Sequence, residues 1–335
     1  MLFPKIGLDL GTCNCVVFLP KKGVVLKEPS IVAVDRFENK ILAVGKEAKE
    51  MVGKTPDSIK IFRPLKDGVI ANFKITKAMI EYFINKVLSF KIFKPDVLIG
   101  IPGSATSTEK RAVIEAGLSA GSRNVYLARQ SILAALGAGI PIESYSGNMV
   151  VDMGGGTTEI AVISLGGIVC GESIRTGGYK IDRAIINYLK EKQNLLIGEQ
   201  TAEEIKIKIG SALLEKDKKE LIVKGRHQLS GLPRKIKINS NDICYAINDI
   251  LEEMVAAIKK VLSQTPPELA ADIIEKGIIL TGGTSQLRNL PRFFSKHLNI
   301  PVLLAKEPIF CVAKGTGIVL DSLSVYKKAL LLKRL

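Results

Sequence analysis

One sequence pattern occurs twice in this chain, and the two copies are separated by nearly half of its 335 residues. Residues 7–12 read GLDLGT, and residues 151–157 read VDMGGGT. Each copy is a short apolar run that carries an aspartate and ends in a glycine turn with a hydroxyl side chain. Short apolar runs bounded by glycine are typical of buried strands. The repeat therefore predicts two related lobes, each presenting one turn to something held between them.

The two turns are suited to binding an anion, and phosphate is the usual one. A turn with several glycines lets backbone N–H groups approach an anion closely. One such turn alone is more often structural, but a third turn at 281–284 (TGGT) supports the binding interpretation. Asp9 and Asp152 would face the same ligand. Two carboxylates beside a polyphosphate require a cation between them, and Mg²⁺ held largely through water meets that requirement.

The composition is that of a folded α/β protein. Hydrophobic residues make up 47% of the chain, which excludes intrinsic disorder. Buried-strand patterns alternate with helical patterns at 76–88, 202–214 and 242–262, and this alternation predicts an α/β fold. The longest apolar stretch, residues 132–142, is about half of what a membrane-spanning helix needs. The chain is therefore expected to be soluble or peripheral to a membrane.

Cysteine content and net charge limit the cellular compartment and the kinds of partner that the chain is expected to have. Five scattered cysteines in a long chain are not a disulfide framework, which favours a reducing compartment. The net charge of +15 is compatible with nucleic acid, with an anionic membrane surface, or simply with a lysine-rich composition. Nucleic acid is the weakest of the three, because no reading motif appears and the chain has no Trp for base stacking.

Longer strings resemble the MreB family of actin-like ATPases over nearly the whole chain. The wider superfamily of actin, sugar kinases and heat-shock chaperones shares only the nucleotide turns. The strings that are similar to the MreB family in particular are RPLKDGVI at 63–70, GLPRK at 231–235 and AKGTG at 313–317. The resemblance implies the α/β actin-like ATPase fold, in which two lobes with related ribonuclease-H-like cores flank a nucleotide cleft.

The resemblance also implies domain boundaries. The first lobe would span residues 1–146, with a small inserted subdomain at about 31–75, and would be completed by residues 312–335. The second lobe would span residues 147–311, with a small inserted subdomain at about 180–240.

Residues of the cleft follow from the same resemblance. Asp9 and Asp152 would orient hydrated Mg²⁺. Glu203 and Lys206 would contact the ribose and adenine of ATP or ADP, and their i, i+3 spacing puts both on one helical face. An ion pair between these two residues within the helix is the alternative. The other nucleotide-binding residues would be Gly11, Thr12, Cys13, Asn14, Gly154, Gly155, Gly156, Thr157, Gly282, Gly283 and Thr284.

The chain departs from the MreB pattern where hydrolysis is expected. Members usually carry Glu-Glu-Pro at the helix that faces the γ-phosphate, and the second glutamate is thought to orient or activate water. The matching residues here are Arg129, Gln130 and Ser131. An amide can orient water but is a poor proton acceptor. We therefore expect nucleotide binding with slow hydrolysis, with Gln130, Asp152 and Thr158 as catalytic residues; an ordinary working ATPase is the alternative.

Two further departures are expected near the cleft. Cys15 replaces a usual threonine, and Asn72 replaces a usual aspartate. Both changes remove a hydroxyl or a charge.

Two segments are candidates for membrane contact. Ile92 and Phe93 lie between lysines in a loop that ends at Pro95, and they match a hydrophobic pair that inserts into the membrane in MreB proteins. Apolar residues flanked by lysine suit an anionic lipid interface. Inward packing of the pair is the alternative. Residues 325–335 are also apolar and basic, and would either lie on a membrane or form the last helix and its frayed end.

The function implied by the resemblance is that of a cytoskeletal filament protein. It would bind ATP and Mg²⁺, stack head to tail into protofilaments that can pair antiparallel, and govern cell shape. It would be cytoplasmic and peripheral, at the inner face of the cell membrane, with anionic lipid and membrane-bound cell-shape proteins as partners and no nucleic acid. The alternatives are a soluble sugar-kinase-like phosphotransferase on the same fold and a non-hydrolysing scaffold filament.

Overall fold

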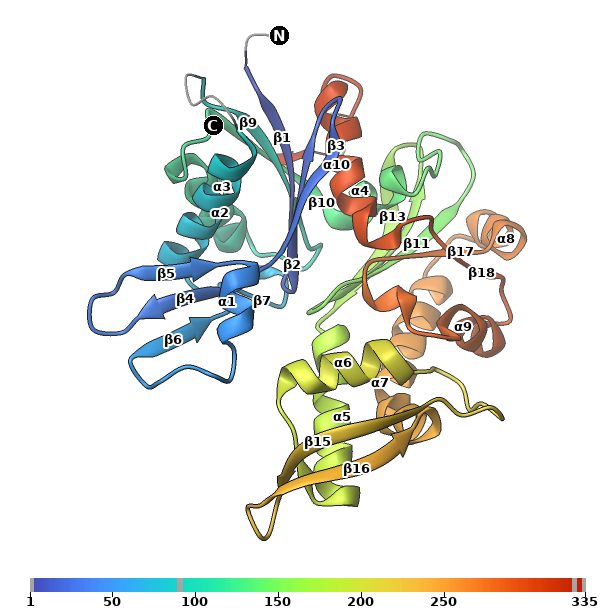
Figure 1. The fold of residues 1–335 in the computed structure, drawn as a ribbon. Helices are drawn as coiled ribbons and strands as arrows, with labels where there is room; N and C mark the ends of the chain where they lie inside the picture. The colour runs from blue at the N-terminus through green and yellow to red at the C-terminus, as the bar shows by residue number, and fades with distance from the viewer. Residues whose placement is uncertain (1–2, 89–92, 327–329, 333–335) are drawn as a thin grey trace.

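A computed structural model describes residues 3–88, 93–326 and 330–332 of the chain. Two β-sheets form its centre (Figure 1). In spatial order, the first sheet contains β19 (Leu330–Leu332), β10 (Asn124–Arg129), β9 (Asp96–Ile101), β1 (Lys5–Leu10), β2 (Asn14–Leu19) and β3 (Gly23–Pro29). The second contains β13 (Gly167–Ile174), β12 (Thr158–Ser164), β11 (Asn148–Met153), β17 (Ile278–Thr281) and β18 (Val302–Leu304).

The two sheets share one strand plan, as the sequence repeat predicts. β1 pairs antiparallel with β2 and parallel with β9, and β11 pairs in the same way with β12 and β17. Asp9 and Asp152 thus occupy equivalent strands, each near the glycine turn of its hairpin. The predicted α/β actin-like fold with two related cores is confirmed.

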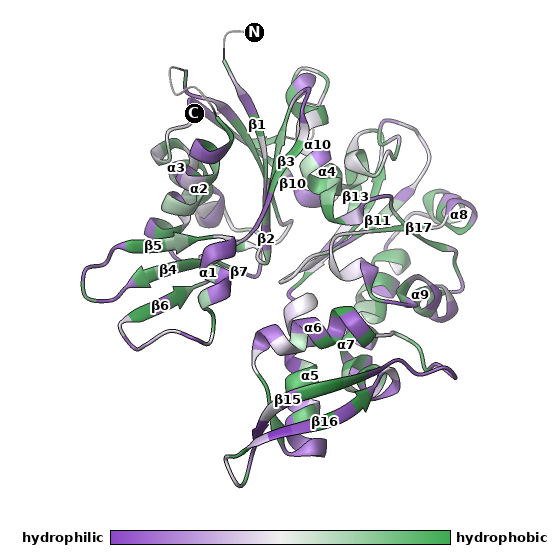
Figure 2. Cartoon of the chain, in the orientation of Figure 1, coloured by the Kyte–Doolittle hydropathy of each residue, from purple (hydrophilic) through white to green (hydrophobic). Residues whose placement is uncertain are grey.

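Amphipathic helices cover the outer faces of the sheets. The first lobe has α2 (Phe73–Val87) and α3 (Ser107–Ser119), and the second has α7 (Ser240–Ser263), α8 (Pro267–Lys276) and α9 (Leu290–Leu298). A further helix, α5 (Gly178–Gln193), packs against α7. In α2 the predicted apolar face is buried, with Met79 and Phe83 wholly inaccessible in the core of the first lobe. Figure 2 shows hydrophobic residues along the strands of both sheets.

Two helices lie between the sheets, and the second of them carries the AKGTG string. α4 (Gln130–Gly137) and α10 (Cys311–Asp321) share an apolar cluster with strands of both sheets. They cross so closely that a Cβ on Gly137 would collide with the backbone of Cys311, and one on Gly315 with the backbone of Leu133. Glycine at these positions therefore permits the crossing that joins the lobes at the base of the cleft.

A small sheet extends from each lobe. One contains β5 (Ile41–Val44), β4 (Val32–Asp35) and β6 (Ile59–Phe62), with helix α1 (Lys46–Met51). The other contains β14 (Leu195–Leu196), β15 (Glu220–His227) and β16 (Pro233–Asn239), with helix α6 (Glu199–Ile209). Short elements complete the chain, namely β7 (Leu65–Lys66), β8 (Val69–Ile70), η1 (Thr284–Gln286) and η2 (Pro308–Phe310). We retain the domain boundaries given above as a proposal.

Two expectations about local structure are wrong. The helix expected at 202–214 ends at Ile209, because Gly210 follows and Ser211 pairs with Arg288 in a β-bridge. Residues 330–332 of the C-terminal segment are not a last helix: they form strand β19, which pairs with β10 at the edge of the first sheet. Among the described residues, no helix has the length and apolar character needed to cross a bilayer.

Candidate functional site

A cavity of about 550 Å³ lies where the glycine turns of the two lobes meet. This volume is within the usual range for small-molecule sites. Most of the residues predicted from the sequence line it. They are Asp9, Gly11, Thr12, Cys13, Asn14, Gln130, Asp152, Gly154, Gly155, Gly156, Thr157, Glu203, Lys206, Gly282, Gly283 and Thr284.

The first two turns touch each other across the cleft. A Cβ on Gly155 would lie 2.6 Å from the Cβ of Cys13, and one on Gly156 would lie 2.8 Å from the hydroxyl oxygen of Thr12. Real side chains do not approach this closely, so glycine is required for the turns to meet. The approach leaves backbone groups of both lobes facing one ligand volume, which is the arrangement that binds phosphate.

Hydroxyl groups hold the turns in place. Thr12 Oγ1 accepts a hydrogen bond from the backbone N–H of Gly68 at 2.8 Å, and Thr284 Oγ1 donates to the carbonyl of Gly154 at 2.8 Å. Thr158 is wholly buried, does not line the cavity, and donates its hydroxyl to the carbonyl of Thr176 at 2.6 Å. In this conformation Thr158 supports the second turn, and its catalytic role stays a prediction.

The two aspartates create a need for positive charge. Burial and the nearby Asp152 raise the pKa of Asp9 to about 8, although a hydrogen bond from Gln130 opposes this shift. Burial raises the pKa of Asp152 to about 6, opposed by the Thr281 hydroxyl, which donates to Asp152 Oδ1 at 2.9 Å. Neighbouring buried carboxylates repel each other, and a cation relieves that repulsion.

These residues fit a hydrated Mg²⁺ rather than a cation held wholly by protein. Among the described residues, no group of three or more His, Cys, Asp or Glu side chains is placed to hold a metal ion. Mg²⁺ is commonly held by one or two carboxylates, with water and phosphate oxygens as its other ligands. The Asp9 and Asp152 pair supplies that number of carboxylates.

Gln130 is the departure from the family pattern that reaches the cavity. It is the first residue of α4, is 7% exposed, and hydrogen-bonds to Asp9. The other two departures do not line the cavity. Cys15 is fully buried in β2, and Asn72 caps α2, its side chain accepting a hydrogen bond from the N–H of Ile75 at 3.1 Å. The Asn72 side chain is thus committed to a helix end, as is common for asparagine.

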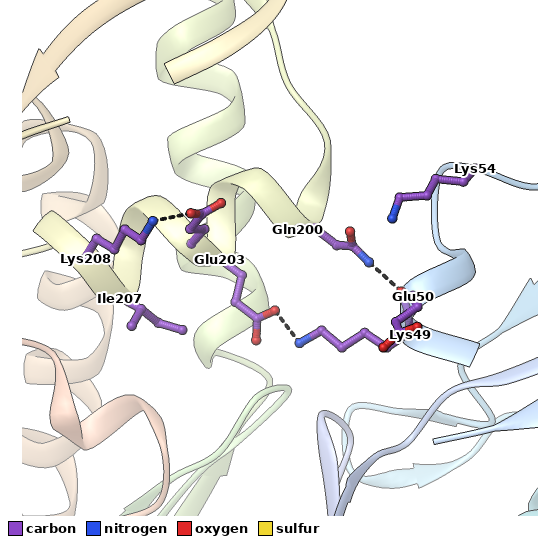
Figure 3. Close-up of a pocket in the computed structure, with 8 residues that line it drawn as sticks. Lys49, Glu50, Lys54, Gln200, Glu203, Ile207 and Lys208 are labelled. Carbon is purple, nitrogen blue, oxygen red and sulfur yellow. Dashed lines mark hydrogen bonds and ion pairs between the residues drawn. The ribbon is translucent and has the colours of Figure 1, made fainter. Parts of the chain in front are cut away.

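Glu203 and Lys206 both line the cavity but are not paired with each other (Figure 3 shows Glu203). The carboxylate of Glu203 accepts from Lys49 Nζ at 2.7 Å. The ammonium of Lys206 lies 2.7 Å from Asp182 Oδ1 and donates to the carbonyl of Gly178 at 3.2 Å. The alternative of an ion pair within α6 is therefore wrong, because each side chain has a partner on another element.

Sequence reasoning missed an apolar wall and several polar residues of the cavity. The missed polar residues are Lys27, Tyr179, Asp182, Gln286 and Arg288. The wall is suited to a flat apolar group such as a base, and the EP string at 307–308 was the available signal for part of it. Its members are Ile181, Ile207, Leu287, Pro308, Ile309 and Val312.

Of the candidate membrane pair, Ile92 lies outside the described residues, and Phe93 is 44% exposed. The Phe93 ring contacts Phe3 edge to face, with centroids 5.7 Å apart. The guanidinium of Arg123 lies 3.6 Å from the centroid of the Phe3 ring. An aromatic pair beside a cation is thus present at the surface of the first lobe.

Comparison with known proteins identifies the family. A family model described as MreB/Mbl protein matches residues 4–328. The cell shape-determining protein Mbl of Bacillus subtilis is 49% identical, covering 98% of this chain and 99% of that protein. The cell shape-determining protein MreB of Escherichia coli is 45% identical, covering 97% of this chain and 96% of that protein.

Solved structures agree with these relatives. The crystal structure of MreB5 of Spiroplasma citri bound to ADP is similar with a TM-score of 0.92 and 35% identity, covering 97% of this chain and 98% of that one. A MamK double helical filament structure, at 19% identity and a TM-score of 0.81, covering 95% of this chain and 99% of that one, shares the fold. The chain belongs to the MreB/Mbl family of actin-like proteins.

Proposed function

We propose that this protein binds ATP or ADP with Mg²⁺ between its lobes and assembles into filaments that govern cell shape. The observation that carries the proposal is the cavity in which two glycine turns and the carboxylates of Asp9 and Asp152 converge. The relatives agree with it: MreB5 of Spiroplasma citri was crystallised with ADP and with AMPPNP, and Mbl and MreB are named as cell shape-determining proteins.

Each part of the cavity has a place in this proposal. The glycine turns would bind phosphates through backbone N–H groups, and Gly282, Gly283 and Thr284 would adjoin the adenosine. Asp9 and Asp152 would hold hydrated Mg²⁺, which supplies charge neutralisation for phosphoryl transfer. Glu203 and Lys206 would contact the nucleoside, and the apolar wall would pack against the base.

Hydrolysis would be slow, because Gln130 stands where the family usually has glutamate. Its amide can orient water, but it hydrogen-bonds to Asp9 and accepts protons poorly. We expect Gln130→Glu to raise the rate of phosphate release from Mg-ATP by about 10-fold or more, within the usual effect of a general base. An unchanged rate in Gln130→Glu would show that this residue does not limit hydrolysis.

Self-assembly would be head to tail, since an unclosed heterologous contact generates filaments. Electron microscopy of the purified protein with ATP and with AMPPNP tests this directly. Filaments in both nucleotides support the cytoskeletal function. Absence of filaments in every condition, together with phosphate transfer to a small acceptor, would support the soluble phosphotransferase instead. Filaments without any phosphate release would identify the non-hydrolysing scaffold.

Membrane association at the inner face of the cell membrane would bring the filaments to membrane-bound cell-shape proteins. The support is the exposed Phe93, its contact with Phe3, and the net charge of +15. We expect the combined Ile92→Ser and Phe93→Ser variant to sediment less with anionic vesicles than the wild type. Equal sedimentation of both proteins would remove this loop from the membrane contact.

A further inference from the structure

Glu203 lines three adjoining pockets of the molecule. It lines the main cavity and also the two smaller pockets that open beside it. One carboxylate oxygen, Oε2, accepts from Lys49 Nζ, which comes from α1 in the opposite lobe (Figure 3). A carboxylate can accept several hydrogen bonds, so Oε1 retains its capacity for a ligand.

The helix that carries Glu203 also holds the backbone of Lys49. Gln200 Nε2 donates to the carbonyl oxygen of Lys49 at 2.6 Å. Gln200 and Glu203 are three residues apart on α6 and therefore lie on one face of the helix. Lys49 is thus fixed at its main chain and at its ammonium group by two side chains of the same helix.

The solvent exposure of Lys49 and Glu203 indicates whether their ion pair serves folding stability or orientation. The side chains of Lys49 and Glu203 are 36% and 26% exposed. A partly exposed ion pair contributes little to folding stability. Two hydrogen bonds from one helix face can nevertheless fix the direction of the Glu203 carboxylate at the edge of the nucleotide cavity.

We propose that Lys49 is a positioning residue, which orients Glu203 from the opposite lobe so that the carboxylate accepts a hydrogen bond from a ribose hydroxyl. Recognition of the sugar then depends on both lobes being in contact. This inference rests on the proposed nucleotide binding and adds a residue of the first lobe to sugar recognition.

The test compares nucleotides that differ only in a sugar hydroxyl. Calorimetry measures the dissociation constants of Mg-ATP, Mg-2′-deoxy-ATP and Mg-3′-deoxy-ATP. We expect the wild type to prefer ATP over at least one deoxy analogue by about 10-fold, as for a hydrogen bond to a charged group. Lys49→Ala should reduce that preference to about 3-fold or less, and Lys49→Arg should retain most of it.

Lys54→Ala is the matched control. Lys54 is exposed and, together with Lys49, lines one of the two smaller pockets. Within the described part of the chain, it makes no ion pair with α6. Its replacement should leave the preference unchanged. Glu203→Gln should lose the preference, and adding Lys49→Ala to it should cause no further loss, since the two residues act as one unit.

The possible results distinguish the positioning role of Lys49 from the proposed nucleotide binding. An unchanged preference in Lys49→Ala would overturn the positioning role, provided that the variant melts at the wild-type temperature. A wild type that binds all three nucleotides equally would overturn sugar recognition by Glu203 while leaving nucleotide binding intact. A wild type that binds none of them would overturn the proposed function itself.

Discussion

The base and the rim of the cleft join the two lobes by different physical means. At the base, α4 and α10 cross through glycines, and Glu159 of the second lobe accepts from the backbone N–H of Gly103 in the first at 2.9 Å. At the rim, partly exposed side chains meet, as in the ion pair between Arg63 and Glu199 at 2.7 Å.

Buried backbone contacts tolerate almost no change in volume, whereas exposed ion pairs are weak and are screened by salt. The base is therefore suited to fix where the lobes pivot, and the rim to set how readily they open. The predictions that follow test this division, from the largest expected effect to the smallest.

Gly315→Ala should have the largest effect on stability. The added Cβ would collide with the backbone of Leu133, which cannot move away as a flexible side chain could. We expect the free energy of unfolding to fall by about 3 kcal/mol, at the upper end for overpacking. Urea unfolding measures the change.

Gly198→Ala serves as the control for this substitution. Among the described residues, no atom would lie within 4 Å of a Cβ added to Gly198, and its φ is −87°. Because alanine is a poorer N-cap than glycine, a loss of about 1 kcal/mol is expected. Equal losses in the two variants would contradict a tightly packed base.

Glu159→Gln should change how stability depends on pH. Burial raises the pKa of Glu159 from 4.5 to about 7, and this exceeds the opposing effect of the Ser173 hydroxyl and the Gly103 N–H. A raised carboxyl pKa means that the folded chain binds the proton more tightly, so this group lowers stability as pH rises from about 4.5 to about 7.

As pH rises from about 5 to about 8, the free energy of unfolding of Glu159→Gln should therefore increase by about 1–3 kcal/mol relative to that of the wild type. Urea unfolding across this range, without nucleotide or Mg²⁺, measures the difference. Glu38→Gln, at an exposed carboxylate in a loop, should show no such trend. If the difference in unfolding free energy between Glu159→Gln and the wild type does not change with pH, the result would contradict a buried carboxylate with a raised pKa at the base.

Arg63→Ala should affect the rim with little effect on folding. Arg63 donates to Tyr179 Oη at 2.8 Å and to Glu199 at 2.7 Å, and its guanidinium lies 4.8 Å from the Tyr179 ring centroid. We expect bound nucleotide to dissociate about 2- to 5-fold faster, the scale of a partly exposed pair. Stopped-flow displacement of a fluorescent ATP analogue measures this rate, and Arg63→Lys should restore it only in part. If Arg63→Ala instead causes a large loss of folding stability, Arg63 stabilises the fold in the way expected of the contacts at the base.

The repeat and the glycine turns could be predicted because their signals are local. A strand that ends in a glycine turn is formed by consecutive residues, so the sheets and about half of the cavity-lining residues could be predicted from the sequence and its resemblance. Lys49 and Tyr179 could not be found in this way, since their contacts join residues far apart in the chain. Orientation was also hidden: Asn72 caps a helix and Thr158 donates inward, although both lie beside the expected motifs.

Mg²⁺-dependent nucleotide binding is the measurement that tests the central claim most directly. Calorimetry should show that the wild type binds ATP much more tightly with Mg²⁺ than without it. Asp152→Asn keeps an acceptor for the Thr281 hydroxyl but removes the charge; it should weaken Mg-ATP binding by about 10-fold or more, as expected for a lost charge contact. The exposed Asp57→Asn is the control. Equal binding of Mg-ATP by the wild type and Asp152→Asn, or equal binding of ATP with and without Mg²⁺, would contradict a Mg-nucleotide site at these aspartates.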